Sequence, residues 1–152
     1  MSKLDTVRHI YERFAQGDAP AILATFEDDI EFRLAEGHPY SPDGEAWIGG
    51  DAITKHFFAK AGAEWRDWSF HVGQTIETPD AVVVEGRYSA LYVPTGRELD
   101  AQGCHVWRFR NGRIASFHQY VDTARVQHVM GAPAWPPHET PNVFPGIPVA
   151  DS

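Results

Sequence analysis

The segment from Cys104 to Asp122 carries residue types that acid–base chemistry needs, on what the sequence predicts to be a β-hairpin. Its Asn111-Gly112 pair is typical of a two-residue type I′ turn, which pairs Arg110 with Arg113. Side chains alternate along a strand, so one hairpin face is expected to hold His105, Trp107, Phe109, Ile114, Ser116, His118, Tyr120 and Asp122. Two imidazoles, a phenol, a carboxylate and an indole on one half-buried face predict an acid–base site with an aromatic wall.

Asp122 is the first candidate for a general base, because it ends the second strand on the face of His118 and Tyr120. Burial in an apolar cavity raises the pKa of a carboxyl, which makes the carboxylate a better base near neutral pH. The alternative is that Asp122 N-caps the helix expected after it, and one residue can do both.

The histidines of this face are predicted to oppose each other directly in a non-hydrogen-bonded pair. His105 or His118 can then donate to a substrate oxygen while the other orients Asp122, and Tyr120 is a further candidate donor. The plainer alternative is a pair of half-buried imidazoles satisfied by their neighbours. A metal site of these histidines with Asp122 or Glu36 matches no established ligand spacing, so we expect no metal and no cofactor.

The composition is typical of a globular domain. The 152 residues are 43% hydrophobic and 22% charged. A net charge of −8 argues against nucleic acid and anionic membranes as partners, and no apolar run approaches the length of a membrane span. The charged, amphipathic N-terminus has no signal-peptide core, so a cytoplasmic location is expected. The single cysteine, Cys104, excludes an internal disulfide and a cysteine-based zinc site.

Hydrophobic periodicity and turn residues predict helix, helix, strand, helix, four strands and a closing helix. The helices are expected at Lys3–Gln16, after an N-cap at Asp18, at Ala52–Ala61 after an N-cap at Asp51, and at Thr123–Val129. The strands are expected at Ile30–Leu34, Ser69–Thr78, Ala81–Val93, Glu98–Arg110 and Arg113–Asp122, with a loop at Glu36–Gly50. This order predicts an α+β fold: a cone-shaped α+β barrel with a curved, mostly antiparallel sheet and three N-terminal helices enclosing a cavity.

The sequence predicts one such domain over residues 1–131 and a Pro-rich, extended C-terminal tail over residues 132–152. The tail is too apolar for a typical disordered segment, so we expect it to lie across the protein or across a partner subunit.

Local patterns that recur in the same order also resemble a known family. They are Phe26–Phe32 (FEDDIEF), Glu36–Tyr40 (EGHPY), Gly49–Ile53 (GGDAI), His105–Trp107 (HVW), Arg110–Ile114 (RNGRI) and Gln119–Thr123 (QYVDT). Together they resemble the nuclear transport factor 2-like superfamily, and within it the SnoaL-like polyketide cyclases and ketosteroid-isomerase-like proteins. The resemblance implies that Asp122 matches the acid–base aspartate of the cyclases and that His105 matches a pocket histidine.

The same resemblance makes the loop after the first strand a candidate part of the site. Ketosteroid isomerases place a catalytic aspartate near the position where this chain has Leu34 and Ala35. Glu36 is a possible substitute for that aspartate. His38 and Tyr40 are expected to shape the cavity mouth.

Limonene-epoxide-hydrolase-like members carry an Arg-x-Asp pattern where this chain has Arg87-x-Ser89, so one acid of the water-activating network is missing. The alternative for Arg87 is an ion pair with Glu85. Tyr11 and Trp47 are candidate wall and lid residues, and core packing is the alternative for each.

The leading hypothesis is a SnoaL-like, cofactor-independent enzyme for a hydrophobic, carbonyl-bearing small molecule. It would catalyse isomerisation, aldol-type cyclisation or dehydration, with Asp122 as the base and His105 and Tyr120 stabilising an enolate oxygen. The alternatives are a non-catalytic small-molecule-binding or dimerisation module of this fold and an epoxide hydrolase. A homodimer through the outer sheet face is expected, because the second hairpin face, with Val106 and Phe117, is too apolar to be left open.

Overall fold

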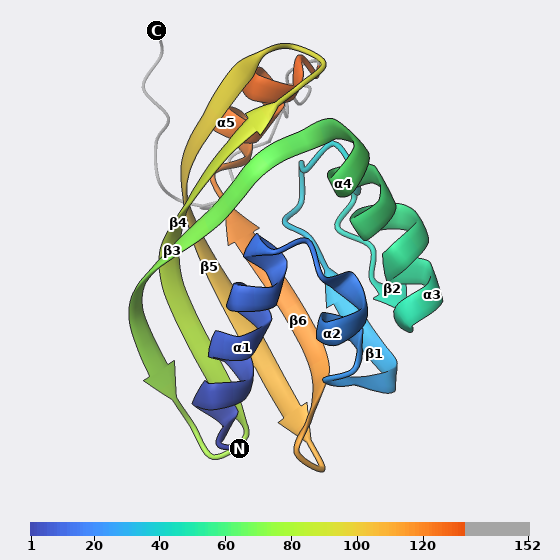
Figure 1. Cartoon of the computed structure of the whole chain (residues 1–152), viewed down its shortest axis with the longest axis vertical. Helices are drawn as coiled ribbons and strands as arrows, with labels where there is room; N and C mark the ends of the chain where they lie inside the picture. Colours follow the sequence, from blue (N-terminus) through green and yellow to red (C-terminus); the bar gives the residue numbers. More distant parts are fainter. Residues whose placement is uncertain (133–152) are drawn as a thin grey trace, which may run out of the picture.

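A curved six-stranded sheet forms one layer of the structure, and helices cover one of its faces (Figure 1). The structure is a computed structural model that describes residues 1–132. The strands are β1 (Phe26–Arg33), β2 (Trp47–Ile48), β3 (Trp65–Glu77), β4 (Ala81–Tyr92), β5 (Arg97–Arg110) and β6 (Arg113–Val121), in the order β2-β1-β6-β5-β4-β3. β1 runs parallel to β6, and the other neighbouring pairs are antiparallel. The predicted α+β class is therefore confirmed. The predicted tail lies, apart from residue 132, outside the described residues.

The N-terminal helices begin at residues that satisfy their free amides. α1 (Lys3–Ala15) starts with a capping box, in which the Ser2 side chain accepts from the amide of Asp5 and the Asp5 side chain accepts from that of Ser2. α2 (Ala19–Leu23) begins after Asp18, whose side chain accepts from the amide of Ala21, as predicted. α5 (Thr123–Met130) ends at Gly131, which has a φ of 68° that favours glycine.

The third predicted helix is longer and less regular than expected. It consists of α3 (Gly50–Ile53), a π-helical segment η1 (Thr54–Phe58) and α4 (Ala59–Glu64), which follow one another without a break. Gly49 occupies its N-cap and no side chain caps it, so the prediction that Asp51 is the N-cap was wrong. Phe57 and Phe58 both lie in the wider turn of η1. Both face the inner side of the sheet and line the same cavity.

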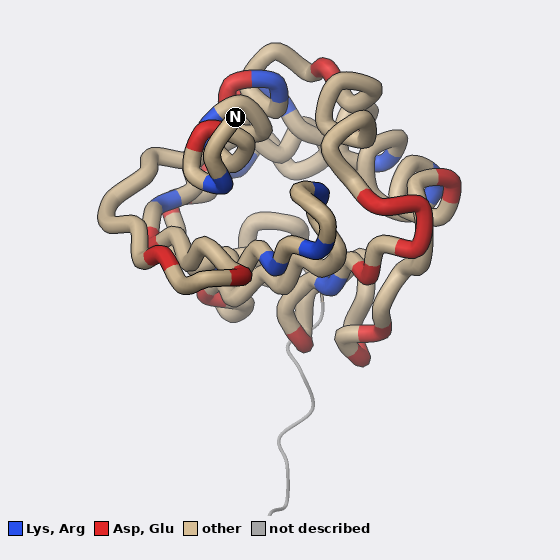
Figure 2. The backbone as a smooth tube through the Cα atoms, turned by 90° about the horizontal axis from the view of Figure 1, so that it is seen from below, with Lys and Arg blue, Asp and Glu red and all other residues tan. Residues whose placement is uncertain are grey.

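The hydrophobic core lies between the helices and the inner face of the sheet. Its fully buried side chains come from both layers, and include Ile30 of β1, Ile53 of α3, Val82 and Val84 of β4, and Ile114 of β6. Burial of each such side chain contributes roughly 1.5–3 kcal/mol. In the view of Figure 2 the helices lie on one side and the strands on the other, and acidic and basic residues are scattered over the described chain. No helix within residues 1–132 is long and apolar enough to span a membrane.

The β5–β6 hairpin forms at the predicted turn, but its register differs from the prediction. Arg110 pairs with Arg113 as expected, and Asn111 and Gly112 both have a positive φ. A bulge on β6 between Ser116 and Ile114 then shifts the pairing by one residue. The pairs are Trp107 with Phe117 and His105 with Gln119, so the prediction that His105 and His118 oppose each other was wrong.

The physical reason for the bulge is the position of two apolar residues. Ile114 and Phe117 lie an odd number of residues apart, so in a regular strand they would face opposite sides of the sheet. The extra residue, Ala115, lets both face the core, where they are 0% and 5% exposed. Phe117 and Gln119 therefore join the face of His105, and His118 moves to the outer face.

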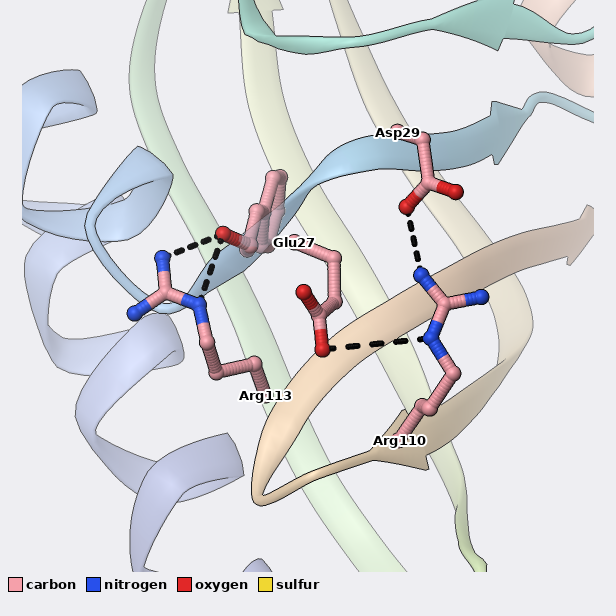
Figure 3. Close-up of polar contacts among 5 residues, drawn as sticks. Glu27, Asp29, Arg110 and Arg113 are labelled. Atoms are coloured by element: carbon pink, nitrogen blue, oxygen red, sulfur yellow. Dashed lines mark hydrogen bonds and ion pairs between the residues drawn. The ribbon is translucent and has the colours of Figure 1, made fainter.

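Arginine contacts fasten the β5–β6 turn to β1 (Figure 3). The guanidinium of Arg113 donates to the carbonyl oxygen of Phe26 through Nε, at 3.1 Å, and also through an Nη atom. Arg110 pairs with Asp29 and lies 3.9 Å from a carboxylate oxygen of Glu27. Arg110 and Asp29 are largely exposed, so their pair contributes little to stability and serves to align the turn.

Candidate functional site

A small cavity lies between the helices and the inner face of the sheet. It has a volume of about 50 Å³ and is walled mainly by aromatic side chains. Its lining residues are Ile10, Tyr11, Phe14, Ile22, Phe26, Phe32, Leu34, His38, Tyr40, Phe57, Phe58, Trp68, Phe70, Tyr88, His105, Trp107, Phe117 and Gln119. None of these carries a carboxylate, so its polar groups are phenols, imidazoles, indoles and one amide.

A continuous chain of hydrogen bonds runs along one wall of the cavity. The phenol oxygen of Tyr11, from α1, lies 2.7 Å from Nδ1 of His105 and accepts from Nε1 of Trp107 at 2.9 Å. On the other side of the ring, Nε2 of His105 is hydrogen-bonded to the phenol oxygen of Tyr88. Tyr88 accepts from Nε2 of Gln119 at 2.9 Å. The orientation of the Gln119 amide is fixed by the amide of Ala35, which donates to its Oε1 at 3.3 Å.

Burial keeps this chain of groups uncharged. Desolvation lowers the pKa of His105, which is 3% exposed, from 6.5 to about 3, so the imidazole is neutral at physiological pH. Burial also raises the pKa of both the Tyr11 and the Tyr88 phenols far above the usual value for tyrosine. Neither a free phenolate nor an imidazolium is therefore favoured in the resting site.

The neutral chain holds one hydrogen more than its contacts use. At the two ends of the chain, Trp107 donates to Tyr11 and Gln119 donates to Tyr88. The two inner hydrogen bonds, between Tyr11 and His105 and between His105 and Tyr88, need one hydrogen each. The two phenols and the single N–H of the neutral imidazole supply three. One phenol O–H is thus left over: that of Tyr88 when His105 carries its hydrogen on Nε2, and that of Tyr11 when the hydrogen is on Nδ1.

Two glycines on adjacent strands make room for the rings of this wall. Gly86 of β4 pairs with Gly103 of β5 on the inner face. A Cβ on Gly103 would lie 2.8 Å from the Tyr88 ring, and one on Gly86 would lie 2.6 Å from the Phe70 ring. The two glycines thereby leave space for the rings of Tyr88 and Phe70 next to the sheet backbone, and Phe70 stacks on His105 with ring centroids 4.2 Å apart.

A second polar cluster lies at the α4 end of the cavity. The Tyr40 hydroxyl donates to Oε2 of Glu64 at 2.6 Å and accepts from Nε1 of Trp65 at 3.2 Å, and Tyr92 donates to the same carboxylate oxygen at 3.1 Å. His38 accepts from the amide of Tyr40 through Nδ1, so its hydrogen is on Nε2. Burial lowers the pKa of His38 to about 4, so this imidazole is a neutral donor.

A β-bulge in β3 directs Trp68 to the cavity. Asp67 has a φ of 58°, in the left-handed region, at a bulge between Arg66 and Ser69. The extra residue brings Trp68 to the same side as Trp65 and Phe70, with the Trp65 and Trp68 ring centroids 4.9 Å apart. Nε1 of Trp68 is buried and has no acceptor within residues 1–132.

The structure brings some of the predicted site residues to the cavity: Tyr11, His38, Tyr40, His105 and Trp107. The hairpin register displaces the others of that face. His118 and Tyr120 lie on the outer face, hydrogen-bonded to each other at 3.1 Å, and Tyr120 is 51% exposed. The prediction that they share the face of His105 was therefore wrong. Over the described residues, no three potential metal ligands come together.

Asp122 also lies outside the cavity lining. Its Oδ1 accepts from the amide of Arg125 at 3.3 Å, so it N-caps α5, the alternative that the sequence left open. Glu36 borders a surface hollow beside His118 and Tyr120. Arg87 forms an exposed ion pair with Asp100 instead of Glu85.

Trp47 packs against Phe32 and His56, with ring centroids 6.2 and 5.7 Å apart, and does not line the cavity. Sequence reasoning missed several residues that do: Tyr88, Gln119, Trp68 and Phe70, together with Glu64 behind Tyr40. The available signal for Tyr88 was its even spacing from the apolar Val82 and Val84 on the same strand.

Comparisons with known proteins agree with this architecture. The SnoaL-like domain family matches residues 7–117. An NTF2-like protein from Burkholderia pseudomallei is 29% identical with a TM-score of 0.78, over 87% of this chain and 100% of that chain. TerC co-crystallised with polyporic acid is 22% identical with a TM-score of 0.74, over 85% and 98%. IdmH, a candidate polyketide cyclase from Streptomyces antibioticus, is 20% identical with a TM-score of 0.71, over 87% and 100%. A search of curated proteins finds no match.

Proposed function

Since the chain belongs to the SnoaL-like domain family, we propose that its cavity binds a hydrophobic, carbonyl-bearing small molecule and isomerises it by proton transfer. The observation that carries this proposal is the surplus phenol O–H of the chain Tyr11–His105–Tyr88. A buried donor without a partner costs free energy, and a ligand oxygen in the cavity supplies the missing acceptor. An apolar cavity with a few converging donors is typical of small-molecule sites.

The same three residues can move a proton without creating a charge. With the imidazole hydrogen on Nε2, Tyr88 gives its proton to the carbonyl oxygen and receives the hydrogen of His105 Nε2. His105 Nδ1 takes the proton of Tyr11, and Tyr11 takes a proton from the carbon next to the carbonyl. One C–H bond breaks and one O–H bond forms, so the ketone becomes its enol. In a β,γ-unsaturated ketone the enol is a conjugated dienol, so the reverse transfer can deliver the proton to its γ-carbon. This returns the protein to its first tautomer and leaves the isomerised, α,β-unsaturated ketone.

This proposal replaces the base suggested by the sequence. Asp122 caps α5 and does not line the cavity, whereas both phenols do. The relay suits the burial of the site, because a stepwise route through a phenolate would oppose the raised pKa of Tyr11 and Tyr88. Two solved structures of the same fold are consistent with a small-molecule site: TerC was crystallised with polyporic acid and IdmH is a candidate polyketide cyclase.

A binding module without chemistry is the second candidate. The specific observations in its favour are the small volume of the cavity, about 50 Å³, and the lack of a carboxylate in its lining. Epoxide hydrolysis has no comparable support, because Arg87 pairs with Asp100 on the outer face.

Exchange of carbon-bound hydrogen for deuterium tests the proposal without knowledge of the natural substrate. β-Tetralone, an aromatic ketone, is incubated with the protein in heavy water, and the loss of its α-proton signals is followed by NMR. We expect the protein to accelerate this loss, and the variants Tyr11→Phe and Tyr88→Phe to lower the acceleration by about 10²–10³-fold. Tyr120→Phe, on the outer face, is the matched control and should retain the wild-type rate.

The result also separates the two candidates. Binding of β-tetralone with exchange no faster than in buffer favours the binding module. Full acceleration in Tyr88→Phe contradicts the relay, because that variant has no proton to give to the ketone.

We further propose that two copies of the chain associate through the outer sheet face. The register places Ile76, Val83 and Val106 side by side across β3, β4 and β5, and Ile76 is 52% exposed. On β6, His118 is in register with Val106, and the exposed Tyr120 lies two residues further along the same face. Sedimentation velocity should give a dimer for the wild type and a monomer for Val106→Lys, and a wild-type monomer at high concentration would contradict the proposal.

A further inference from the structure

The free volume of the cavity is too small for the ligand class proposed above. It measures about 50 Å³, whereas an apolar cavity known to bind benzene has a volume of about 150 Å³. Any bicyclic ketone must therefore gain space from side chains that move.

A second hollow adjoins the cavity on the helix side. It lies between the α1–α2 turn and α4, has a volume of about 90 Å³, and reaches the surface at the exposed residues Gly17 and Gly62. Its lining residues are Phe14, Gly17, Ala19, Ile22, Phe58, Ala61, Gly62 and Trp68. Phe14, Ile22, Phe58 and Trp68 also line the cavity, so they form a wall one side chain thick between the two spaces.

The wall contains the unpaired indole N–H of Trp68. The ring of Trp68 contacts Phe14 edge-on, with centroids 5.7 Å apart, and its centroid lies 5.6 Å from that of Tyr88. Its Nε1 is buried and no residue among 1–132 accepts from it. An unpaired buried donor is costly, and an acceptor brought by a ligand would satisfy it.

Two of the four backbone segments that carry the wall are irregular, whereas α1 and α2, which carry Phe14 and Ile22, are regular helices. Trp68 follows Asp67, whose φ of 58° is unusual for a residue other than glycine, and Phe58 ends the π-helical segment η1. π-helical turns and strained positions are frequent at ligand sites, where they place side chains that regular elements would direct elsewhere.

We propose that the ligand site extends through this wall into the outer hollow, and that Trp68 Nε1 donates to an acceptor atom of the bound molecule. The inference rests on the proposed function and names the ligand more closely. The molecule is an elongated aromatic ketone, with its carbonyl at the Tyr11–His105–Tyr88 chain and a second acceptor at the far end of its ring system, beside Trp68. Phe14 and Phe58 turn aside to admit it, and the outer hollow is the entrance.

Gly62 offers a sharp test, because it lies in α4 and a Cβ at this position would have no heavy atom within 4 Å. Gly62→Leu places a large side chain at the rim of the outer hollow, where its Cβ has room, and is intended to fill the hollow. Gly62→Ala is the matched control, which gains a similar helix propensity but leaves the hollow open. The probe is prodan, a naphthalene ketone with an amine at the far end, whose fluorescence reports an apolar environment. Stopped-flow fluorescence gives its association rate and equilibrium titration its affinity.

We expect prodan to bind the wild type and Gly62→Ala alike, and to associate with Gly62→Leu about tenfold more slowly or worse. Equal association with all three proteins overturns the inference and leaves the proposed function intact. No binding to any of them contradicts the proposed function and this inference with it.

The role of Trp68 has its own readout. In the wild type, the indole N–H resonance of Trp68, assigned with Trp68→Phe, should move downfield when prodan binds, and Trp68→Phe should weaken binding by about tenfold. A resonance that stays in place, with unchanged affinity in Trp68→Phe, overturns the assignment of this donor.

Discussion

The phenol oxygen of Tyr11 lies 2.7 Å from Nδ1 of His105, although 94 positions separate the two residues. This contact joins α1, in the helix layer, to β5, in the sheet, and the indole of Trp107 donates to the same oxygen at 2.9 Å. One hydroxyl group therefore satisfies two buried ring nitrogens from the opposite layer. The packing of α1 on the sheet is thus partly polar, and it depends on a group that is also proposed to take part in proton transfer.

Tyr11→Phe should lower the free energy of unfolding by about 1–3 kcal/mol, because it leaves the Trp107 N–H and one nitrogen of His105 without a partner. The phenyl ring retains its stacking on Phe70, at 5.2 Å, so the loss reports the hydroxyl alone. Urea unfolding measures the change. In a double-mutant cycle with Trp107→Phe, the second substitution should cost less in the Tyr11→Phe background, and strictly additive losses would contradict the shared hydrogen bond.

The buried histidines should make stability depend on pH in a defined window. In the unfolded chain His38 and His105 have a pKa near 6.5, and in the folded protein burial lowers these values to about 4 and about 3. Above pH 6.5 both states are neutral and the histidines have no effect. Below it the unfolded state binds protons that the folded state cannot, so each histidine lowers the free energy of unfolding by about 1.4 kcal/mol per pH unit.

Urea unfolding at several pH values measures this slope, which should continue for His38 to about pH 4 and for His105 to about pH 3. His105→Asn should reduce it by the contribution of one proton, and His118→Asn should reduce it less, because His118 is only partly buried and its pKa is lowered less. Stability that stays level between pH 6.5 and about 5 would show that the imidazoles can take up protons in the folded protein.

Most helices and strands of this fold could be predicted from short sequence patterns. The residues of the candidate site could not, because their positions depend on strand register and on contacts between distant residues. The helix starts at Ser2 and Asp18 and the turn at Asn111-Gly112 are decided by residues within a few positions of each other. The side of the sheet that His118 faces is decided by a bulge that arises because Ile114 and Phe117 both have to reach the core. One extra residue was enough to exchange His118 for Gln119 beside His105.

Long-range contacts account for the other missed residues. Tyr88 belongs to the site because its hydroxyl meets His105 and Gln119 from neighbouring strands, and because Gly103 leaves room for its ring. Trp68 points inward because of a positive φ at Asp67, a conformation that an aspartate in a strand sequence does not indicate. Strand pairing and bulges set these relationships, and neither can be read from residue periodicity alone.

Gly103→Ala tests whether the space next to the Tyr88 ring is required. The added methyl would lie 2.8 Å from the ring, whose hydroxyl is held by His105 and Gln119, so the ring cannot swing away without breaking those contacts. We expect a loss of about 1–3 kcal/mol in the free energy of unfolding, together with loss of any proton exchange in a bound ketone. Gly62→Ala is the control and should be stabilising by up to about 1 kcal/mol. A neutral Gly103→Ala would show that the ring is not fixed.

Substitutions of Asp67 should separate the backbone strain of the β3 bulge from its effect on ligand binding. At a φ of 58°, a β-branched side chain is disfavoured and glycine or asparagine is tolerated. Asp67→Val should therefore lower the free energy of unfolding by about 1–3 kcal/mol, and Asp67→Asn should leave it nearly unchanged. If the bulge directs Trp68 to the ligand, Asp67→Val should also weaken prodan binding, whereas Asp67→Asn should leave it unchanged. Thermal unfolding and fluorescence titration of the same samples measure both effects, and a Val variant as stable as the Asn variant would mean that the bulge does not require a left-handed residue.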